Sequence, residues 1–358
     1  MTEIRINLYS DTQTRPTPEM RRAMAEAPVG DEQLGEDPSV NRLCAMVAEL
    51  LGKEEAVFLP SGTMCNQIAV LVHCRPGDEI LVDRAAHILN TEGGGPAALA
   101  GVMVRPLDGV RGVFNAEQVE AAVREERRYA PRSRLVSVEQ TANLGGGTVW
   151  PLAAIRAVAE VARRHGLALH MDGARLMNAV VASDVPARDF AEPFDSVWID
   201  LSKSLGGPVG AVLAGSSDFV GEAWRWKQRI GGAMRQAGIV AAAGIYALEH
   251  HVERLAEDHA NARLFAERIA DLPGVVVELE TVETNMVFFD VAGTGLTAAV
   301  LSARLAERGV RIGRTDQFRL RAVTHLDVTR AEVEQAAEAV RAVVSEAGAA
   351  TRSTGRKR

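Results

Sequence analysis

The residue whose surroundings most clearly indicate chemical reactivity is a lysine that follows a short apolar stretch. Residues 196–201 are mostly apolar, and Lys203 is followed by the glycine-rich segment 205–210. Lysine otherwise occurs only at positions 53, 227 and 357, in charged or polar surroundings. An apolar setting disfavours the ammonium form, so the neutral amine can act as a nucleophile that forms a Schiff base. The alternative is a structural lysine that packs its stem and keeps its charge in solvent.

An aspartate occupies the same kind of position in the preceding strand-like stretch. Residues 167–171 are mostly apolar, and Asp172 is followed directly by Gly173. A carboxylate at the end of a buried strand needs a partner, because burying an unpaired charge is costly. Since the carboxyl ends of parallel strands meet at one edge of a sheet, we expect Asp172 and Lys203 to lie at the same edge.

A short Ser-Gly-Thr turn could bind an anion. Ser61, Gly62 and Thr63 separate a predicted strand at 55–60 from a predicted apolar helix at 67–72. Such a turn places backbone N–H groups, two hydroxyls and the positive end of a helix dipole at one point. An ordinary helix N-cap explains the same tripeptide equally well.

Two further polar residues, His87 and Glu92, follow the strand predicted at 78–83. His87 alone could be a hydrogen-bonded core residue, and Glu92 alone could be a loop carboxylate. With the lysine, the aspartate and the anion-binding turn, however, they match the needs of one cofactor. Pyridoxal 5'-phosphate (PLP) requires an amine for its aldehyde, a carboxylate for its ring nitrogen, donors for its phosphate and often a flat partner for its ring. The sequence therefore predicts a PLP site.

The pattern of elements predicts how these residues are positioned. Strand-like and helix-like segments alternate from residue 55 to residue 215, which indicates an α/β fold with a mostly parallel sheet under helices. After Pro273 the pattern changes to strands with small helices between them, which indicates a second, smaller C-terminal α/β domain. The predicted parts are an N-terminal segment at 1–15 that contributes to the site, a large domain at 16–250, a small domain at 251–347 and a disordered basic tail at 348–358.

Three local predictions are specific enough to be compared with the structure. Ser39 is expected to cap a helix that ends at Leu51. A charged amphipathic helix is expected at 115–129, and the first strand of the small domain is expected at 275–279.

Composition narrows the classes of function. The 358 residues are 47% hydrophobic and carry a net charge of −7, which argues against nucleic acids and other polyanions as partners. Apolar runs are too short for a membrane span and the first residues lack a signal pattern, so we expect no membrane association and a cytoplasmic location. Cys44, Cys65 and Cys74 lack zinc-ligand spacing, and we expect reduced thiols and no bound metal.

These motifs, taken in order, resemble those of a known family. The chain resembles the low-specificity L-threonine aldolases, which are PLP-dependent lyases with an aspartate-aminotransferase-like fold. The resemblance extends from Asp11 to about Asp327. Its landmarks are residues 10–12, 15–16, 35–41, 61–66, 86–88, 170–176, 202–210, 234–238 and 321–325.

The resemblance implies how the cofactor is held. Lys203 would form the Schiff base, Asp172 would face the ring nitrogen and His87 would stack on the ring. Gly62 and Thr63 would hold the phosphate, where the helix N-terminus favours an anion.

The resemblance also implies an assembly and a substrate class. Arg235 would reach the phosphate of a neighbouring subunit, so the protein would be a homo-oligomer, either a dimer or a tetramer. Ser10, Arg175 and Arg321 would bind the carboxylate of an amino-acid substrate, which the planar guanidinium can hold with two hydrogen bonds.

The reaction implied is the cleavage of a β-hydroxy-α-amino acid. When its Cα–Cβ bond is held perpendicular to the cofactor ring, that bond breaks, and glycine and an aldehyde are released. Glu92, alone or through a water, and His87 are the candidates that assist proton transfer from the β-hydroxyl.

Two positions depart from the family pattern. Ala142 stands where the family usually has a histidine near the substrate hydroxyl, and Leu34 stands where it usually has a tyrosine. Both changes replace polar groups with apolar ones. They predict a roomier, more apolar pocket that favours phenylserine-like or α-substituted β-hydroxy amino acids over threonine.

Other functions stay open within and outside this fold. A β-eliminating lyase or an amino-acid racemase would share the cofactor and the lysine. A non-catalytic relative would have little use for both a Schiff-base lysine and a carboxylate clamp. A nicotinamide enzyme is disfavoured, because no G-x-G-x-x-G fingerprint follows a first strand.

Overall fold

The computed structural model describes residues 3–355, with side chains described to residue 349. Contacts within the chain divide it into two compact units. The smaller unit comprises Met1–Thr14 and Arg254–Arg358, and the larger unit comprises Arg15–Glu253. The division expected after residue 250 lies close to this boundary. The N-terminal segment joins the smaller unit because its strand pairs with a strand from the last part of the chain.

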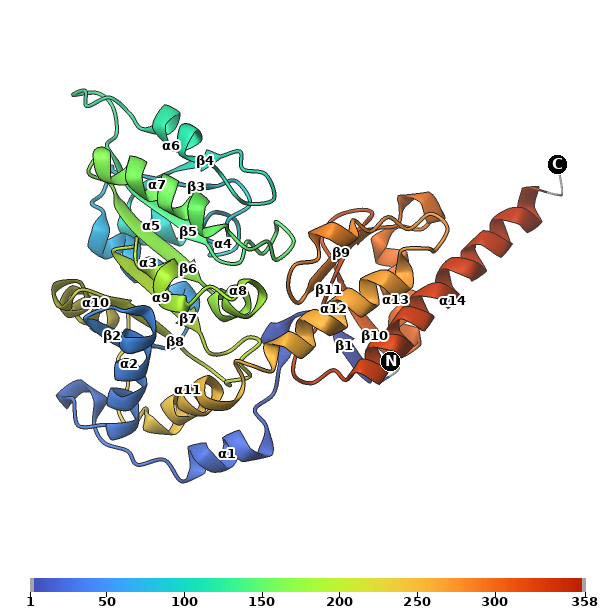
Figure 1. Cartoon of the computed structure of the whole chain (residues 1–358), viewed down its shortest axis with the longest axis horizontal. Coiled ribbons are helices and arrows are strands. Elements are labelled where there is room, and N and C mark those ends of the chain that lie inside the picture. The colour runs from blue at the N-terminus through green and yellow to red at the C-terminus, as the bar shows by residue number, and fades with distance from the viewer. Residues whose placement is uncertain (1–2, 356–358) are drawn as a thin grey trace. The chain divides into compact units, whose positions relative to one another are not determined.

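The larger unit is built on a seven-stranded sheet with the order β2-β8-β7-β6-β5-β3-β4 (Figure 1). Its strands are β2 (Glu55–Leu59), β3 (Glu79–Asp83), β4 (Met103–Leu107), β5 (Ser133–Glu139), β6 (Ala168–Gly173), β7 (Ser196–Asp200) and β8 (Ala211–Gly215). Neighbouring strands from β4 to β7 are parallel, and β8 is antiparallel to both β7 and β2. All strands except β8 therefore end at the same edge of the sheet.

Helices cover this sheet because its strands are apolar along their length. Every residue of β3, β7 and β8 is buried, as expected for a sheet covered on both faces. Helix α3 lies against β5 to β8, α2 and α10 lie against β2 and β8, and α7 lies against β6. The helices of the larger unit are α1 (Pro18–Ala25), η2 (Glu32–Leu34), α2 (Pro38–Leu51), α3 (Gly62–His73), α4 (His87–Asn90), α5 (Gly95–Ala100), α6 (Ala116–Ala122), α7 (Leu152–Arg164), α8 (Leu176–Ser183), α9 (Ala187–Ala191), α10 (Ser217–Arg229) and α11 (Gly238–His250).

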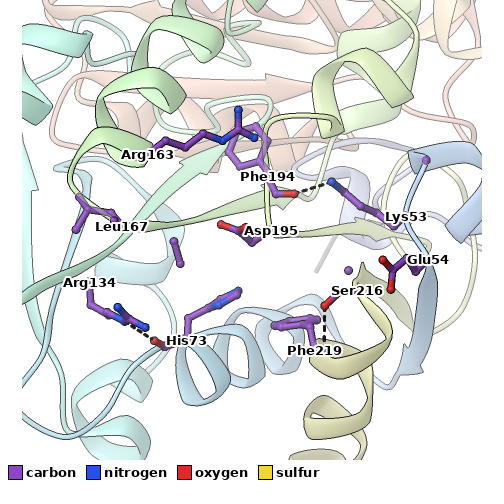
Figure 2. A pocket seen from close by; sticks show the side chains of 14 residues that line it. Lys53, Glu54, His73, Arg134, Arg163, Leu167, Phe194, Asp195, Ser216 and Phe219 are labelled. Carbon is purple, nitrogen blue, oxygen red and sulfur yellow. Dashed lines mark hydrogen bonds between the residues drawn. The ribbon is translucent and has the colours of Figure 1, made fainter.

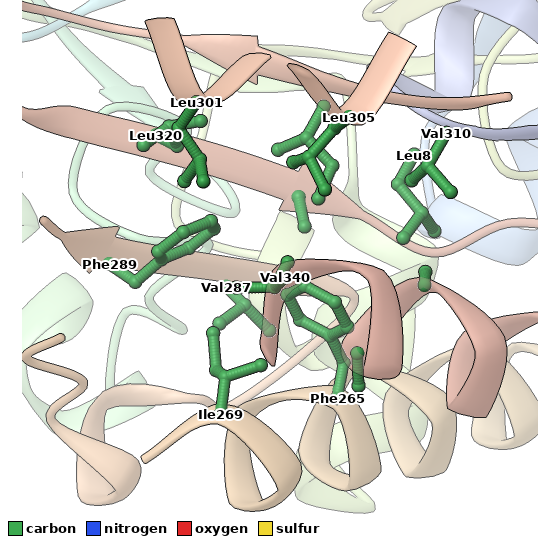
Figure 3. Close-up of a cluster of buried hydrophobic side chains, with 14 of the residues drawn as sticks. Leu8, Phe265, Ile269, Val287, Phe289, Leu301, Leu305, Val310, Leu320 and Val340 are labelled. Carbon is green, nitrogen blue, oxygen red and sulfur yellow. The ribbon is translucent and has the colours of Figure 1, made fainter. Parts of the chain in front are cut away.

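The smaller unit has its own sheet and its own core. Its strands are β1 (Ile6–Leu8), β9 (Met286–Asp290), β10 (Val310–Arg314) and β11 (Arg319–Val323), in the order β1-β10-β11-β9. Its helices are η1 (Asp11–Gln13), α12 (Leu255–Ile269), η3 (Leu279–Thr281), η4 (Ala292–Thr294), α13 (Ala298–Glu307) and α14 (Arg330–Gly355). Figure 3 shows Phe265, Phe289, Leu305 and Val340 meeting between the sheet and these helices. Within residues 3–355, no helix combines the length and the apolar character needed to cross a membrane.

Two helices begin or end elsewhere than the sequence suggests. Helix α2 begins at Pro38, because Asp37 rather than Ser39 is its N-cap and its carboxylate accepts the N–H groups of Ser39 and Val40. Helix α6 ends at Ala122 instead of continuing to 129. The backbone N–H of Arg124 instead donates to the Ser133 hydroxyl, so the chain has left the helix there.

Two predictions in the smaller unit also differ from the structure. In the expected strand at 275–279, Val276 forms an isolated bridge to Asp290, and η3 follows at once. In the expected disordered tail at 348–358, α14 continues through Gly355, in a stretch whose alanines favour helix. Residues 356–358 of that predicted tail lie outside the described residues.

Candidate active site

The polar residues predicted from the sequence come from the common carboxyl edge of the parallel strands. Gly62 begins α3 after β2, and His87 begins α4 after β3. Glu139 ends β5, Asp172 lies at the end of β6, and Lys203 follows β7. The parallel order of the sheet thus brings residues from distant parts of the sequence to one edge, where ligands bind in open α/β sheets.

Lys203 is held by the residues around the end of β7. Its ammonium forms an ion pair with the carboxylate of Asp200. The other oxygen of Asp200 accepts hydrogen bonds from the N–H and the hydroxyl of Ser202, at 2.7 and 2.8 Å. Lys203 Nζ also lies 5.6 Å from the ring centre of Trp198, within range of a cation–π attraction. The amine is therefore oriented by a carboxylate and an indole.

Asp172 is a buried carboxylate with fixed hydrogen bonds. Its Oδ1 accepts the N–H of Ala174 at 3.0 Å, and its Oδ2 accepts an N–H of the Asn66 amide at 2.8 Å. Burial raises the pKa of Asp172, while the Asn66 hydrogen bond and the positive charge of Lys203 act in the opposite direction. Asn66 therefore favours the ionised form of Asp172 in a place that otherwise disfavours it.

His87 and Glu92 form a directly bonded pair beside Asp172. His87 Nδ1 lies 2.8 Å from Glu92 Oε1, and the hydrogen bond to Glu92 raises the pKa of His87. Asn66 donates to the same Glu92 oxygen at 2.7 Å, and Gln67 donates to the other at 2.6 Å. One ligating atom each from His87, Glu92 and Asp172 lie within 4.8 Å of one another. The structure thus brings together three of the side chains singled out in the sequence.

A second buried glutamate, Glu139, holds the backbone next to this pair. Its Oε2 accepts the backbone N–H of His87 at 2.8 Å, and its Oε1 accepts the N–H of Asn143 at 3.0 Å. Burial, together with repulsion by the nearby Asp172, raises the pKa of Glu139 to about 7. Glu139 therefore anchors the start of α4 and the loop after β5.

The Ser-Gly-Thr turn forms the N-terminus of α3, one turn earlier than the helix expected from residue 67. Ser61 is its N-cap and accepts the N–H of Met64 at 3.2 Å. A β-carbon built on Gly62 would lie 2.2 Å from the Trp198 ring, so only glycine allows this approach. Thr63 is exposed at the helix start. The turn is thus both an N-cap and an exposed helix N-terminus.

The other predicted site residues are distributed over both units. Arg175 is a buried residue of the larger unit that follows β6 and is the N-cap of α8. Ser10 and Arg321 belong to the smaller unit, where β10 lies between β1 and the strand that carries Arg321. Arg235 lies in the loop before α11; its guanidinium is 65% exposed and pairs with Asp31 at 3.0 Å. The structure thus pairs Arg235 with an acidic residue of the same unit.

Several side chains in the centre had no role assigned from the sequence. Asn66, Glu139, His170, Ser196 and Trp198 are buried polar or aromatic residues that bond to the predicted group or to one another. The signal for those on strands was present in the sequence, because His170 alternates with Asp172, and Ser196 with Trp198, in otherwise apolar strands. In a strand, alternate residues share one face.

A cavity of about 700 Å³ lies at the opposite, amino edge of the sheet. Figure 2 shows its walls, which include Lys53, His73, Arg134 and Arg163. Lys53 precedes β2, His73 ends α3, Arg134 lies at the start of β5 and Arg163 lies in the last turn of α7. This cavity therefore lies away from the edge that carries Lys203.

The side chains at the carboxyl edge fit PLP by their chemistry. Lys203 is a primary amine, and His87 offers a flat ring. Each carboxylate oxygen of Asp172 accepts one of the hydrogen bonds described above, and each can accept a second, so the group can take the N–H of a pyridine ring. The exposed start of α3 suits a phosphate.

Comparison with known proteins identifies the family. The sequence profile described as "Beta-eliminating lyase" matches residues 7–292. The low specificity L-threonine aldolase of Escherichia coli (strain K12) is 42% identical over 341 residues, which cover 95% of this chain and 99% of that protein. Low-specificity L-threonine aldolase 1 of Arabidopsis thaliana is 40% identical over 333 residues, covering 92% and 93%. The chain belongs to the low-specificity L-threonine aldolase family.

Solved structures agree on the fold. The threonine aldolase of Leishmania major has a TM-score of 0.82 at 20% sequence identity, covering 95% of this chain and 99% of that one. The expected family and α/β fold class are thus confirmed. Membership of the low-specificity L-threonine aldolase family makes the chain a PLP-dependent lyase, as the sequence predicted.

Proposed function

We propose that this protein cleaves the Cα–Cβ bond of β-hydroxy-α-amino acids to glycine and an aldehyde. Threonine, allo-threonine and bulkier phenylserine-like compounds belong to this substrate class. The observation that carries the proposal is the clustering of Asp172, His87 and Glu92 at the sheet edge that also holds Lys203. Its support from outside the chain is the family, whose relatives in Escherichia coli and Arabidopsis thaliana are named L-threonine aldolases.

Five residues would hold the cofactor. Lys203 supplies the amine, Asp172 accepts the ring N–H and His87 covers the ring. Gly62 and Thr63 start α3, where free backbone N–H groups and the helix dipole favour a phosphate. When bound, PLP supplies an aldehyde that joins to amino groups and a ring that draws electrons from the bond being broken.

His87 and Glu92 would assist transfer of the proton from the substrate β-hydroxyl. Glu92 Oε1 lies 2.8 Å from His87 Nδ1 and keeps that nitrogen protonated. His87 Nε2 can then exchange a proton with the hydroxyl, because the imidazole is still 36% exposed. Glu92, alone or through a water, is the second candidate, and the amides of Asn66 and Gln67 hold both of its oxygens in place.

Ser10, Arg175 and Arg321 would bind the substrate carboxylate. Arg175 and Arg321 can each hold a carboxylate with two parallel hydrogen bonds, and this fixes the orientation of the bonds at Cα. Removal of either guanidinium should therefore raise KM for all substrates of the class and lower kcat as well.

The side-chain pocket would be more apolar than in relatives with histidine and tyrosine at these positions. Leu34 is 71% exposed in η2, so its side chain is free to contact other groups. Ala142 is different, because its methyl group is only 4% exposed. The gain in room expected at Ala142 is thus limited, and preference for aryl substrates would depend on apolar contact rather than on space.

A cofactor-binding and product assay tests the function. The purified protein is mixed with PLP, its absorbance spectrum is recorded, and L-threonine, L-allo-threonine and phenylserine are then added while aldehyde and glycine are measured. We expect a long-wavelength absorbance band that is lost in Lys203→Ala, and release of both products in the wild-type protein. Lys53→Ala, which changes a lysine at the other edge of the sheet, should behave as the wild type. No band with PLP, or a band without aldehyde, would contradict the proposal.

β-Elimination is the second candidate, because the matching family profile carries that description. The cofactor and lysine would be the same, and the bond broken at Cβ would differ. Release of ammonia and a keto acid without glycine would favour elimination, and inversion at Cα without cleavage would favour a racemase.

We also propose a homo-oligomer in the cytoplasm. The exposed guanidinium of Arg235 could reach a phosphate bound by a second copy of the chain. The three free cysteines, of which Cys65 and Cys74 are buried, suit a reducing compartment. Light scattering gives the number of subunits, and Arg235→Ala should weaken PLP binding without changing the fold of the chain.

A further inference from the structure

A row of polar side chains crosses the buried face of the sheet beneath α3. In the strand register, Ser137 of β5 lies opposite His170 of β6, and His170 lies opposite Ser196 of β7. His170 and Ser196 are fully buried, and both bond to residues of α3. The hydrogen-bonded row that results runs from His73 at the cavity, through Ser196, His170 and Asn66, to Asp172 at the carboxyl edge.

The orientation of the Asn66 amide is determined by its neighbours. Trp198 Nε1, which can only donate, lies 2.7 Å from Asn66 Oδ1. The amide nitrogen faces Asp172 Oδ2 and Glu92 Oε1, at 2.8 and 2.7 Å. Rotating the amide by half a turn would place two donors against each other and an oxygen against two carboxylates. Only one orientation of Asn66 therefore satisfies all of these groups.

That orientation fixes the protons further along the row. His170 Nε2 lies 3.0 Å from Asn66 Oδ1 and must donate to it. Burial lowers the pKa of His170 to about 3 and that of His73 to about 4, so each neutral ring carries one N–H. His170 Nδ1 is then an acceptor, and the Ser196 hydroxyl, 2.8 Å away, donates to it.

The row ends at a histidine in the wall of the cavity. The Ser196 hydroxyl donates its single proton to His170. Ser196 Oγ therefore accepts a hydrogen bond from the N–H at His73 Nε2, which lies 2.8 Å away. His73 is the last residue of α3 and stacks on Phe219, with ring centres 4.9 Å apart (Figure 2). All hydrogen bonds from His73 to Asp172 thus point in one direction.

We propose that His73, Ser196, His170 and Asn66 form a positioning relay that holds Asp172 and Glu92 in the arrangement that binds the cofactor. The relay keeps both N–H bonds of the Asn66 amide directed at the two carboxylates. This inference rests on the proposed function, because it assigns Asp172 to the ring nitrogen of PLP. None of the relay residues has to touch the cofactor or the substrate; they act through Asp172 and Glu92.

The first test compares two serine variants of equal volume change. Ser196→Ala removes the hydroxyl that donates to His170, whereas Ser137→Ala removes a buried hydroxyl from β5, on the other side of β6 and outside the relay. PLP is titrated into apo-protein and the dissociation constant is read from fluorescence. We expect Ser196→Ala to bind PLP about tenfold more weakly than Ser137→Ala, as the loss of one buried hydrogen bond of roughly 1.4 kcal/mol predicts. Equal affinities in the two variants would overturn the relay.

The second test reads the protons directly and does not need the cofactor. Nitrogen-15 NMR of histidine-labelled apo-protein distinguishes the two neutral tautomers, and His170→Gln identifies the signals of His170. We expect His170 to be protonated at Nε2 alone; protonation at Nδ1, or at both nitrogens, would overturn the proposal even if Ser196→Ala fails to fold.

The two tests separate this proposal from the proposed function. If the wild-type protein binds PLP and the two serine variants bind it with equal affinity, only the relay is contradicted. A wild-type protein that binds no PLP contradicts the proposed function, and with it the role of the relay in holding a cofactor.

Discussion

The methyl group of Ala142 packs directly against the backbone of Gly112. A β-carbon built on Gly112 would lie 2.6 Å from the Ala142 β-carbon, and one built on Gly145 would lie 3.1 Å from it. Ala142 follows β5, and Gly112 lies in the turn closed by the bridge between Val110 and Val113. Main chain therefore occupies the space next to position 142, where the family pattern inferred from the sequence has a histidine.

Restoring the family residue with Ala142→His should therefore harm the protein. The imidazole would have to displace Gly112 or turn away from it, and overpacking of this kind costs about 1–3 kcal/mol. We expect a lower melting temperature and no gain in kcat/KM for threonine. Ala142→Ser, which adds a single oxygen, should lose much less stability. A stable Ala142→His protein with raised threonine activity would show that the turn can move.

The contact between Gly62 and Trp198 gives a second prediction. Gly62→Ala would place its methyl group 2.2 Å from the nearest carbon of the Trp198 ring, so the ring would have to move and its hydrogen bond to Asn66 would be disturbed. We expect a loss of about 1–3 kcal/mol in the free energy of unfolding and weaker PLP binding. Gly221→Ala in α10 is the matched control, since a β-carbon there meets nothing within 4 Å and alanine is the better helix former. Equal stability of the two variants in urea would contradict the contact.

A third prediction concerns the ion pair of Lys227 and Glu32. Both side chains are fully buried, Nζ lies 2.8 Å from Oε2, and the ammonium lies 4.1 Å from the Trp224 ring centre. Lys227→Met leaves Glu32 without its buried cation, which typically costs about 3–5 kcal/mol. Arg225→Met is the control, because it breaks an exposed pair with Glu222 in the same helix. Similar unfolding free energies for the two variants would rule out an important role for the buried pair.

The sequence was most informative about residues at strand ends. Lys203, Asp172 and His87 each follow an apolar run that ends in a loop, and parallel strands must bring such ends to one edge. Bonds across the sheet could not be predicted in the same way. Asn66 reaches Asp172 because α3 crosses above β6, and the spacing of 106 residues between them carries no local signal.

Tertiary contacts also explain why two elements predicted from the sequence were wrong. The charged stretch after Ala122 has a helical pattern, but Arg124 is used instead in a bidentate ion pair with Glu79. Propensity predicted the helix, and tertiary contacts ended it. Similarly, residues 275–279 have the β-branched composition of a strand, yet the backbone pairs there as an isolated bridge between Val276 and Asp290.

The raised pKa of Glu139 predicts how stability changes with pH. Burial and repulsion by Asp172 raise it from an ordinary 4.5 to about 7. Between these values the folded protein keeps a proton that the unfolded chain has released, so the free energy of unfolding falls as the pH rises from about 4.5 to 7. The full shift corresponds to ~3 kcal/mol, and above pH 7 this contribution no longer changes.

Glu139→Gln removes the titrating group and should flatten that part of the stability curve. The variant also loses one acceptor for the N–H of His87 or Asn143, so its stability should be lower at acidic pH. The test is therefore the slope of the unfolding free energy between pH 5 and 7, not its absolute value. This slope is measured by urea unfolding of the apo-protein at several pH values. Glu117→Gln, at an exposed position of α6, should keep the wild-type slope. If Glu139→Gln also kept it, Glu139 would have to be ionised throughout this range, and its two backbone hydrogen bonds would then outweigh its burial.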